Sequence, residues 1–298
     1  MKKFFANLVC IFVPSRATRH KIRELADDDT ATPARPNDAE TADPRQEILD
    51  TISRLSNSGQ MILEMNRLFQ MYSFAAAKHP TVFGKYKNAF ADRDVVLVAT
   101  GPSLAKFQPI PGAIYIGVNA AVKYDKIQLD YLVVQDWDAA RHYADELGAN
   151  PATKFYGMLP QHIRDNCNSR GIIPQSIIEK HSANQFVVNN VVFTNPEGAL
   201  AFPFDISVSP PVCSTSVIIT AMQIALWGNP RRIYLVGCDC SSGYFNNPDT
   251  ILNGGEIIPE WEKIKNFARH YYPEVEIISV NPVGLKGMFT DLHQKDEK

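Results

Sequence analysis

The chain has 298 residues, 45% of them hydrophobic, which is enough for one large α/β domain with appendages. Its formal net charge of -2 excludes broad electrostatic capture of nucleic acid, because nucleic-acid-binding proteins carry concentrated basic surface. The five cysteines form an odd, scattered set without zinc-finger spacing, which is typical of free thiols in a reducing cytoplasm.

The N-terminal segment, residues 1–26, joins an apolar run to a basic cluster. Residues 4–13 are apolar but too few to span a bilayer, which needs about 20 residues. Because the basic cluster follows directly and a clean small-x-small site is lacking, an amphipathic anchor on an anionic inner membrane surface is favoured over a secretory signal. A helix docked on the protein's own core would show the same pattern. We therefore expect a cytoplasmic protein, either free or peripheral on the inner membrane.

A linker and a long helix come next. Residues 27–44 are acidic, contain prolines and lack large apolar side chains, which predicts a flexible linker. Residues 45–80 predict a helix that ends at His79-Pro80. This helix either packs on the following domain or forms a coiled-coil homodimer. Gly59 and Asn66 interrupt its heptad-like apolar seam, which consists of Ile48, Ile52, Leu55, Ile62, Phe69 and Tyr72.

Residues 81–298 alternate short apolar runs with helical stretches and form one predicted domain. Strands alternating with helices predict a Rossmann-like, doubly wound and mainly parallel α/β sheet with helices on both faces. The clearest crossover helix covers residues 214–227. The predicted strands are residues 95–99, 113–118, 131–134, 154–158, 232–236 and 275–280.

The first strand ends at a glycine-containing turn. Gly101 lets the backbone turn tightly and approach a ligand, Pro102 suits a first helical turn, and Ser103 offers a hydroxyl beside free amides. Free amides at a helix start suit a phosphate. An ordinary strand-to-helix turn capped by Ser103 explains the same residues.

Polar residues follow the next two predicted strands. Asn119 can donate to and accept from a base or ribose, or it can bond its own backbone in a turn. Asp136 and Asp138 resemble an Asp-x-Asp pair that holds Mg²⁺ or Mn²⁺ against a sugar diphosphate. Asp138 can equally cap the following helix.

Two further loops flank the crossover helix. Ser214, Thr215 and Ser216 place three hydroxyls at its start, where they suit a phosphate or sugar hydroxyls, or serve only as caps. After the next strand, Gly237 turns the chain out and Asp239 either holds a ribose or sugar hydroxyl or braces the loop. Cys238 is a poor nucleophile, because no cationic partner is placed beside it in the sequence.

Four segments in order resemble the bacterial sialyltransferases and the related sugar-transferase-like proteins of lipooligosaccharide, capsule and flagellin glycosylation. These segments are VVLVATGPSLAKF, IGVNAAV, STSVIITAMQIALWGNPRRIYLVGCD and EIISVNPVGLKGMF, within residues 90–290. The resemblance implies nucleotide binding by Gly101, Pro102, Ser103 and Asn119, and contacts to the donor phosphate and sugar by residues 214–216. It also implies that Asn281 lies near the nucleotide. We add Gly237, at the turn after the strand that follows the crossover helix, to the expected nucleotide- or donor-binding residues.

The sequence departs from this family in one region. The family places a histidine general base in a lid before the final helix, whereas residues 246–260 contain no histidine, although their Asn and Gly content still suits a mobile lid. We choose Asp136 or Asp239 as the general base. Other candidates for the base are Asp138, Glu256, Glu260, His142 and His162, and candidates to neutralise phosphate are Arg164, Arg231 and Arg232.

The combined prediction is a glycosyltransferase. It moves a sugar, sialic acid or a related one, from a CMP- or UDP-type donor to a bacterial envelope glycan at the inner membrane surface. Two alternatives stay open: a kinase- or pyrophosphokinase-like phosphotransferase on the same scaffold, and a non-catalytic nucleotide- or glycan-binding accessory protein.

Overall fold

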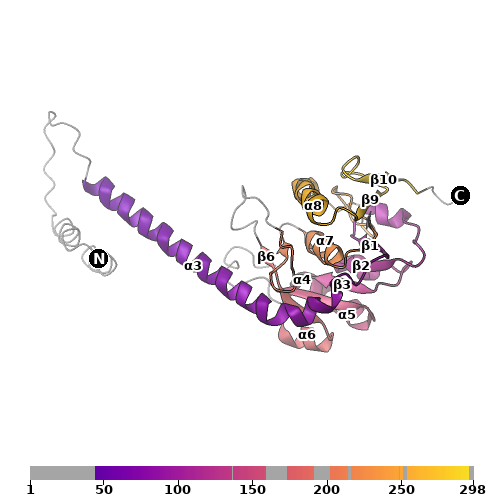
Figure 1. Cartoon of the computed structure of the whole chain (residues 1–298), viewed down its shortest axis with the longest axis horizontal. Helices are drawn as coiled ribbons and strands as arrows, with labels where there is room; N and C mark the ends of the chain where they lie inside the picture. The colour runs from indigo at the N-terminus through magenta and orange to yellow at the C-terminus, as the bar shows by residue number, and fades with distance from the viewer. Residues whose placement is uncertain are drawn as a thin grey trace. The chain divides into compact units, whose positions relative to one another are not determined.

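The computed structural model describes residues 44–135, 137–158, 173–190, 202–213, 216–247, 249–250 and 254–294. Many of its elements are labelled in Figure 1. The predictions for residues 1–43 lie outside these ranges. So do those for five single residues, namely Asp136, His162, Arg164, Ser214 and Thr215.

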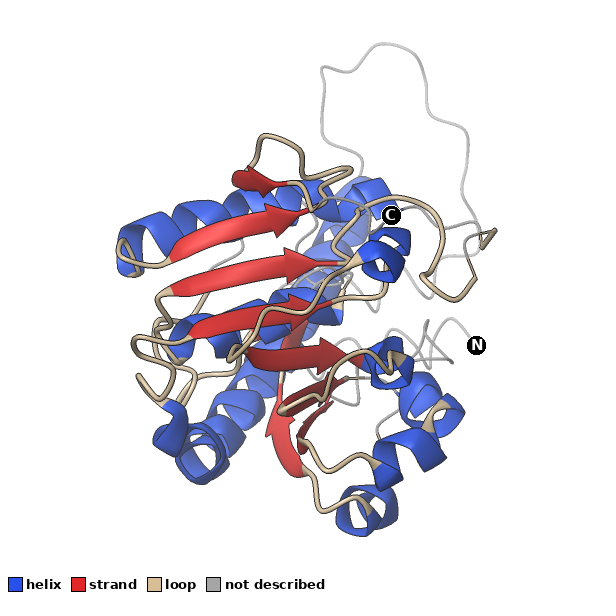
Figure 2. Ribbon diagram, turned by 90° about the vertical axis from the view of Figure 1, so that its right-hand side faces the viewer, coloured by secondary structure: helices blue, strands red, loops and turns tan. Residues whose placement is uncertain are grey.

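The domain is built on a parallel sheet of eight strands in the order β10-β9-β8-β1-β2-β3-β4-β5 (Figure 2). The predicted Rossmann-like α/β fold is therefore confirmed. The strands are β1 (Asp94–Val98), β2 (Ile114–Val118), β3 (Tyr131–Val134), β4 (Thr153–Met158), β5 (Asn184–Val187), β8 (Arg232–Val236), β9 (Glu276–Val280) and β10 (Thr290–Leu292). A separate pair joins β6 (Asn189–Asn190) to β7 (Val212–Cys213).

Both faces of the sheet are covered, which explains why its central strands are continuously apolar. In β1, Val95 and Leu97 contribute to one core, and Val96 and Val98 contribute to the core on the other face. The first core includes residues of α3 (Pro44–Phe83), α7 (Val217–Trp227) and α8 (Ile258–Tyr271). The second includes residues of η2 (Pro102–Lys106), η3 (Asn119–Lys123), α4 (Trp137–His142), α5 (Ala144–Ala149) and α6 (Gln175–Lys180).

The six predicted strands are present, with ends that shift by no more than one residue. The crossover helix begins at Val217 rather than at residue 214. Four short strands, β5, β6, β7 and β10, were not predicted. Each has only two to four residues, and several contain polar residues such as Asn184 and Asn189, so they do not form recognisable apolar runs.

The long helix α3 continues past its predicted end at His79-Pro80. Pro80 lies inside the helix, which ends at Phe83. The last turn persists because Val82 and Phe83 are buried, and the Phe83 ring stacks on Phe155 with a centroid distance of 5.6 Å. Tertiary burial here outweighs the helix-breaking tendency of proline. The compact unit that carries the sheet accordingly begins at Arg67, within α3. Among the described residues, no helix is both long and apolar enough to cross a membrane.

His79 ties three separate segments of this unit together. It is fully buried; its Nδ1 lies 2.9 Å from the Ile206 carbonyl oxygen, and its Nε2 accepts a hydrogen bond from the Val187 amide at 3.1 Å. Since a carbonyl oxygen only accepts, the ring is neutral and carries its proton on Nδ1. Burial lowers the pKa of His79, and the bond to Ile206 offsets part of that effect.

We predict that acid weakens the fold through His79. Below pH 6.5, about the pKa of an unfolded histidine, this side chain binds a proton in the unfolded chain but not in the folded protein. The free energy of unfolding therefore falls as the pH drops, by at most about 1.4 kcal/mol per pH unit for one group. Urea unfolding of His79→Phe should show a loss of about 1–3 kcal/mol at pH 7, because the Val187 amide loses its acceptor. The variant should also show a shallower decline toward pH 5.

The exposed His270 supplies the matched control as His270→Phe, which should keep the parental profile. His181 is also buried with a lowered pKa, so part of the acid sensitivity remains in His79→Phe. An unchanged pH profile in His79→Phe would contradict the proposed role of this ring.

Candidate functional site

A cleft of about 800 Å³ opens at the carboxyl ends of the central strands. The chain leaves β1 toward β2 on one side and returns to β8 on the other, so the strand order reverses at this point. Open α/β sheets bind ligands in the crevice at such a switch point. The cleft is lined by the loops after β1, β2, β3 and β8 and by the starts of α7 and α8.

The Asp239 carboxylate ties the β8 loop to the β1 loop. Its Oδ2 accepts a hydrogen bond from the Ser103 amide at 2.7 Å, and its Oδ1 accepts a second bond from the Ser103 hydroxyl. The Gly101 amide donates to the Gly237 carbonyl oxygen at 2.8 Å. Asp239 is 3% exposed, so these bonds are shielded from water. We call this arrangement of Gly101, Ser103, Gly237 and Asp239 the brace.

The brace requires glycine at two positions. A Cβ on Gly101 would lie 2.5 Å from Asp239 Oδ2 and 2.6 Å from the Gly237 carbonyl oxygen. Gly237 has φ +64, and a Cβ there would lie 2.7 Å from the Ala99 carbonyl oxygen. The two strand ends therefore approach more closely than any side chain would permit.

The brace changes how the predicted residues can act. The Ser103 amide and hydroxyl are committed to Asp239, and η2 is a five-residue 3₁₀ helix, so this turn does not present a free helix start to a phosphate. Gly101 and Gly237 line the cleft, whereas Pro102 and Ser103 are absent from its wall. Asp239 lines the cleft too, but its two oxygens already bind Ser103. Its assignment as general base stays a prediction.

Asn119 stands at the end of β2 in a left-handed conformation, with φ +43. It lines the cleft, and its buried Oδ1 has no hydrogen-bond partner among the described residues. An unpaired buried acceptor is costly unless a ligand or water satisfies it. The alternative of a simple Asx turn is therefore not supported for Oδ1, and Asn119 is available to a ligand.

A buried polar network backs the cleft at the end of β3. Gln135 donates from Nε2 to Thr220 Oγ1 at 2.7 Å, and its Oε1 accepts from Cys213 Sγ at 3.1 Å. Gln223, on α7, accepts from the Val212 amide at 2.8 Å and donates to the Val212 carbonyl oxygen at 2.7 Å. These bonds fix β7 against α7 and so position the start of α7.

Ser216 precedes α7 and lines the cleft. Its side chain makes no capping bond, so the hydroxyl is not used as the ordinary helix cap that the sequence left open. The first residues of α7, Val217 and Ile218, also line the cleft. The start of an 11-residue helix, whose backbone amides favour anions, therefore faces this space.

Charged side chains of α4 line the same cleft. Arg141 and Asp138 form an ion pair with a separation of 3.5 Å, and His142 follows Arg141. The described residues contain no group of three His, Cys, Asp or Glu side chains that could hold a metal ion. Asp138 pairs with Arg141, but Asp136 lies outside the described residues, so the Mg²⁺ or Mn²⁺ site stays a prediction.

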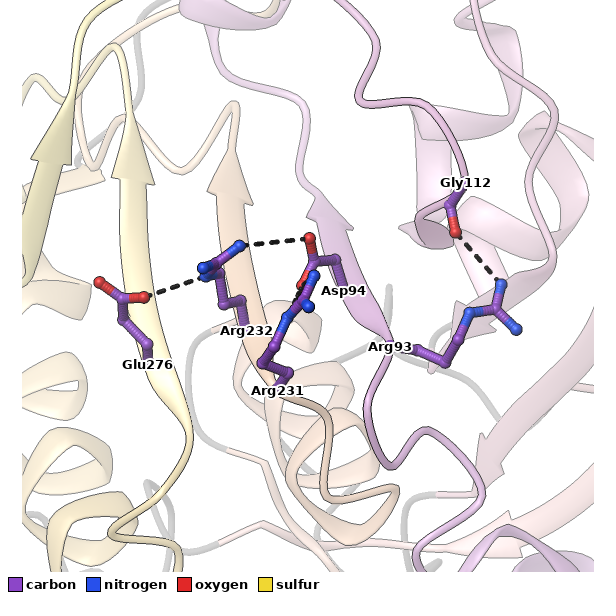
Figure 3. A network of polar contacts seen from close by, with 6 residues as sticks. All are labelled: Arg93, Asp94, Gly112, Arg231, Arg232 and Glu276. Carbon is purple, nitrogen blue, oxygen red and sulfur yellow. Dashed lines mark hydrogen bonds and ion pairs between the residues drawn. The ribbon is translucent and has the colours of Figure 1, made fainter.

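Three predicted residues lie outside the cleft wall. Arg231 and Arg232 adjoin the amino end of β8, where they pair with Asp94 at 2.9 and 3.7 Å, while Arg232 also pairs with Glu276 (Figure 3). This edge is opposite to the cleft, so the two arginines do not line it. Asn281 donates from its amide to the Leu292 carbonyl oxygen, and its Oδ1 accepts from the Gln294 amide at 2.9 Å. It therefore holds β10, and its contact with a nucleotide stays a prediction.

The predicted lid, residues 246–260, is partly helical. Residues 254–257 form η5 (Gly254–Ile257), and α8 begins at Ile258. Glu256 lines the cleft, and Glu260 is buried. Trp261 and Tyr244 also line the cleft and were missed, because neither stands at a strand end.

Two of the three thiols that line the cleft, those of Cys238 and Cys240, are not activated. Burial raises the pKa of Cys238 well above its usual value, and burial raises the pKa of Cys240 to about 12. Both thiols stay protonated at neutral pH, in agreement with the expectation that Cys238 is a poor nucleophile.

Comparisons with known proteins give little further guidance. No family model matches the chain, and a search of curated proteins also finds no match. Among solved structures, the chain is similar to the MAf glycosyltransferase from Magnetospirillum magneticum AMB-1, with 14% identity and a TM-score of 0.41. The similarity covers 76% of this chain and 38% of that one, so the chain spans well under half of that protein.

We predict that Gly101→Ala opens the brace. The added Cβ would push Asp239 from Ser103, and overpacking of this kind costs about 1–3 kcal/mol. Urea unfolding should report the loss. Gly84→Ala is the matched control, because nothing lies within 4 Å of its Cβ. Equal stability of the two variants would show that the brace does not hold the strand ends.

Proposed function

We propose that the chain is a glycosyltransferase that binds a nucleotide-sugar donor in the switch-point cleft. The observation that carries the proposal is Asn119, which lines the cleft and whose buried Oδ1 has no hydrogen-bond partner among the described residues. Gly101, which has no side chain, and the start of α7 line the same cleft. Such a cleft offers a hydrogen-bonding group for a nucleoside and an amide-rich helix start for a phosphate.

The nucleoside binds between the ends of β1 and β2. Gly101 allows close approach of the donor, and Asn119 Oδ1 accepts a hydrogen bond from a base or ribose. The resemblance of VVLVATGPSLAKF and IGVNAAV to the sialyltransferase segments supports a cytidine or uridine nucleotide here. Asp239 supports this subsite through the brace.

The phosphate binds toward α7 and α4. The Ser216 hydroxyl and the first amides of α7 bind its oxygens, and Arg141 supplies positive charge. During transfer the bond between the sugar and the phosphate breaks, and these groups stabilise the negative charge of the departing nucleotide. The acceptor hydroxyl loses its proton to a general base, for which Asp136 and Asp239 remain the candidates.

The identity of the donor sugar, the acceptor and the place of action are proposed from the sequence. The donor sugar is sialic acid or a related sugar, and the acceptor is a bacterial envelope glycan. The apolar and basic segment of residues 1–26 supports work at an inner membrane surface.

Donor hydrolysis tests the proposal. The full chain should release CMP or UDP from a panel of CMP- and UDP-sugars, since water can replace a missing acceptor, and should leave ATP intact. Turnover of ATP without donor hydrolysis would instead identify the phosphotransferase. Tight nucleotide binding without any turnover, with envelope glycans supplied as acceptors, would identify the accessory protein.

We predict that Arg141→Ala weakens nucleotide binding. A hydrogen bond to a charged group contributes about 1.5–3 kcal/mol, so the Kd should rise by roughly 10- to 150-fold, as measured by calorimetric titration with CMP and UDP. Arg269→Ala, at an exposed position on the last turn of α8, is the control and should bind as the parent does. An unchanged Kd in Arg141→Ala would remove this residue from the phosphate subsite.

A further inference from the structure

The helix α3 carries two different stripes of residues. Arg67, Met71, Ala75 and His79 recur every four residues, and all are buried within the unit that begins at Arg67. Met71 and Ala75 pack against Val187, the last residue of β5. This stripe joins the helix to its own domain.

A second stripe of α3 faces solvent. Phe69 lies two residues from both Arg67 and Met71, which places it about 200° around the helix from them. Its side chain is 72% exposed, although phenylalanine is rarely left in water. The other large hydrophobic side chains exposed on this helix are Ile62 at 64%, Leu63 at 69%, Met65 at 63% and Tyr72 at 45%. The seam residues whose exposure the structure describes, Ile62, Phe69 and Tyr72, therefore face solvent.

The seam has the spacing of a coiled coil. With Phe69 placed at heptad position d, the d positions at seven-residue intervals are all large and apolar. Position a then holds Ile52, Gly59, Asn66 and Ser73, and position d holds Ile48, Leu55, Ile62 and Phe69. A repeat of seven residues over more than three heptads is typical of helices that pair with one another, whereas a helix packed on a globular core follows a 3.6-residue period.

We propose that this seam pairs with the same seam of a second copy of the chain, in a parallel, in-register coiled coil. In that arrangement Asn66 faces Asn66 of the second copy, and the two amides can bond each other. A single Asn at position a is known to fix register and oligomeric state in this way. Gly59 at the same position lets the two backbones approach.

The charges of the helix favour a second copy over a membrane. Between residues 48 and 73, positions a, d, e and g hold no charged residue, so two identical seams meet without repulsion. The charged residues lie at b, c and f and are of mixed sign: Asp50, Arg54, Glu64 and Arg67. A helix that lies on an anionic membrane instead carries an excess of Lys and Arg beside its apolar stripe.

Sedimentation of the full chain tests the proposal. The parent should sediment with twice the mass of one chain. The double variant Ile62→Glu/Phe69→Glu should sediment as a monomer, because two d positions would each bury a pair of like charges. Lys78→Glu changes the net charge by the same two units at an exposed position f and should remain a dimer. Unchanged far-UV circular dichroism of the domain shows that the double variant still folds.

Register is tested separately by oxidation of Asn66→Cys, which should give a cross-linked dimer above the background of the parent's own cysteines. Lys78→Cys, at position f, should give no cross-linked dimer above that background. A monomeric parent would overturn the proposal. A dimer that survives the double substitution would also overturn it. If the parent is a monomer and the double substitution abolishes its binding to phosphatidylserine vesicles, the seam binds a membrane instead of a second copy. A dimer without the Asn66→Cys cross-link would overturn the parallel register.

Discussion

The carboxylate of Asp239 is the contact on which the site depends. It lies after β8 and binds the amide and hydroxyl of Ser103, which comes more than 130 residues earlier, after β1. The two strands are neighbours in the sheet, and the brace joins the loops that follow them at the edge of the cleft. Because the carboxylate is buried and satisfied by two donors, the loops are fixed in place. Loss of one partner would leave the other buried and unpaired, which costs more than the bond itself contributes.

The remaining features of the cleft follow from this constraint. Gly101 has no side chain because the brace leaves no space for one, and the same absence gives a ligand access to the backbone. Gln135 performs a similar task on the other wall, where it links the end of β3 to α7 through Thr220. Asn119 and Ser216, which line the cleft, are thereby presented by a rigid frame. A preorganised frame binds more tightly, because little ordering remains to be done when the ligand arrives.

The sequence predicts the sheet well, because buried parallel strands are continuous apolar runs with a recognisable length. It predicts which loops reach the cleft for the same reason, as shown by Gly101, Asn119 and Ser216. The sequence does not predict hydrogen bonds between side chains that lie far apart in the chain. Ser103 is a turn serine in the sequence, and only the fold shows that Asp239 occupies both of its donors. Likewise the seam of α3 is visible in the sequence, but the stripe that the domain buries, ending at His79, is not. Arg141 was overlooked because a charged residue on a short helix has no local signal of function.

The central claim is that the switch-point cleft is the nucleotide site. Hydrogen exchange of the full chain, measured by mass spectrometry with and without CMP or UDP, tests it most directly. We expect slower exchange in residues 99–104, 118–121 and 216–219 when the nucleotide is bound, and no change in residues 184–188 of the β5 edge. Protection that spares all three cleft segments would contradict the claim.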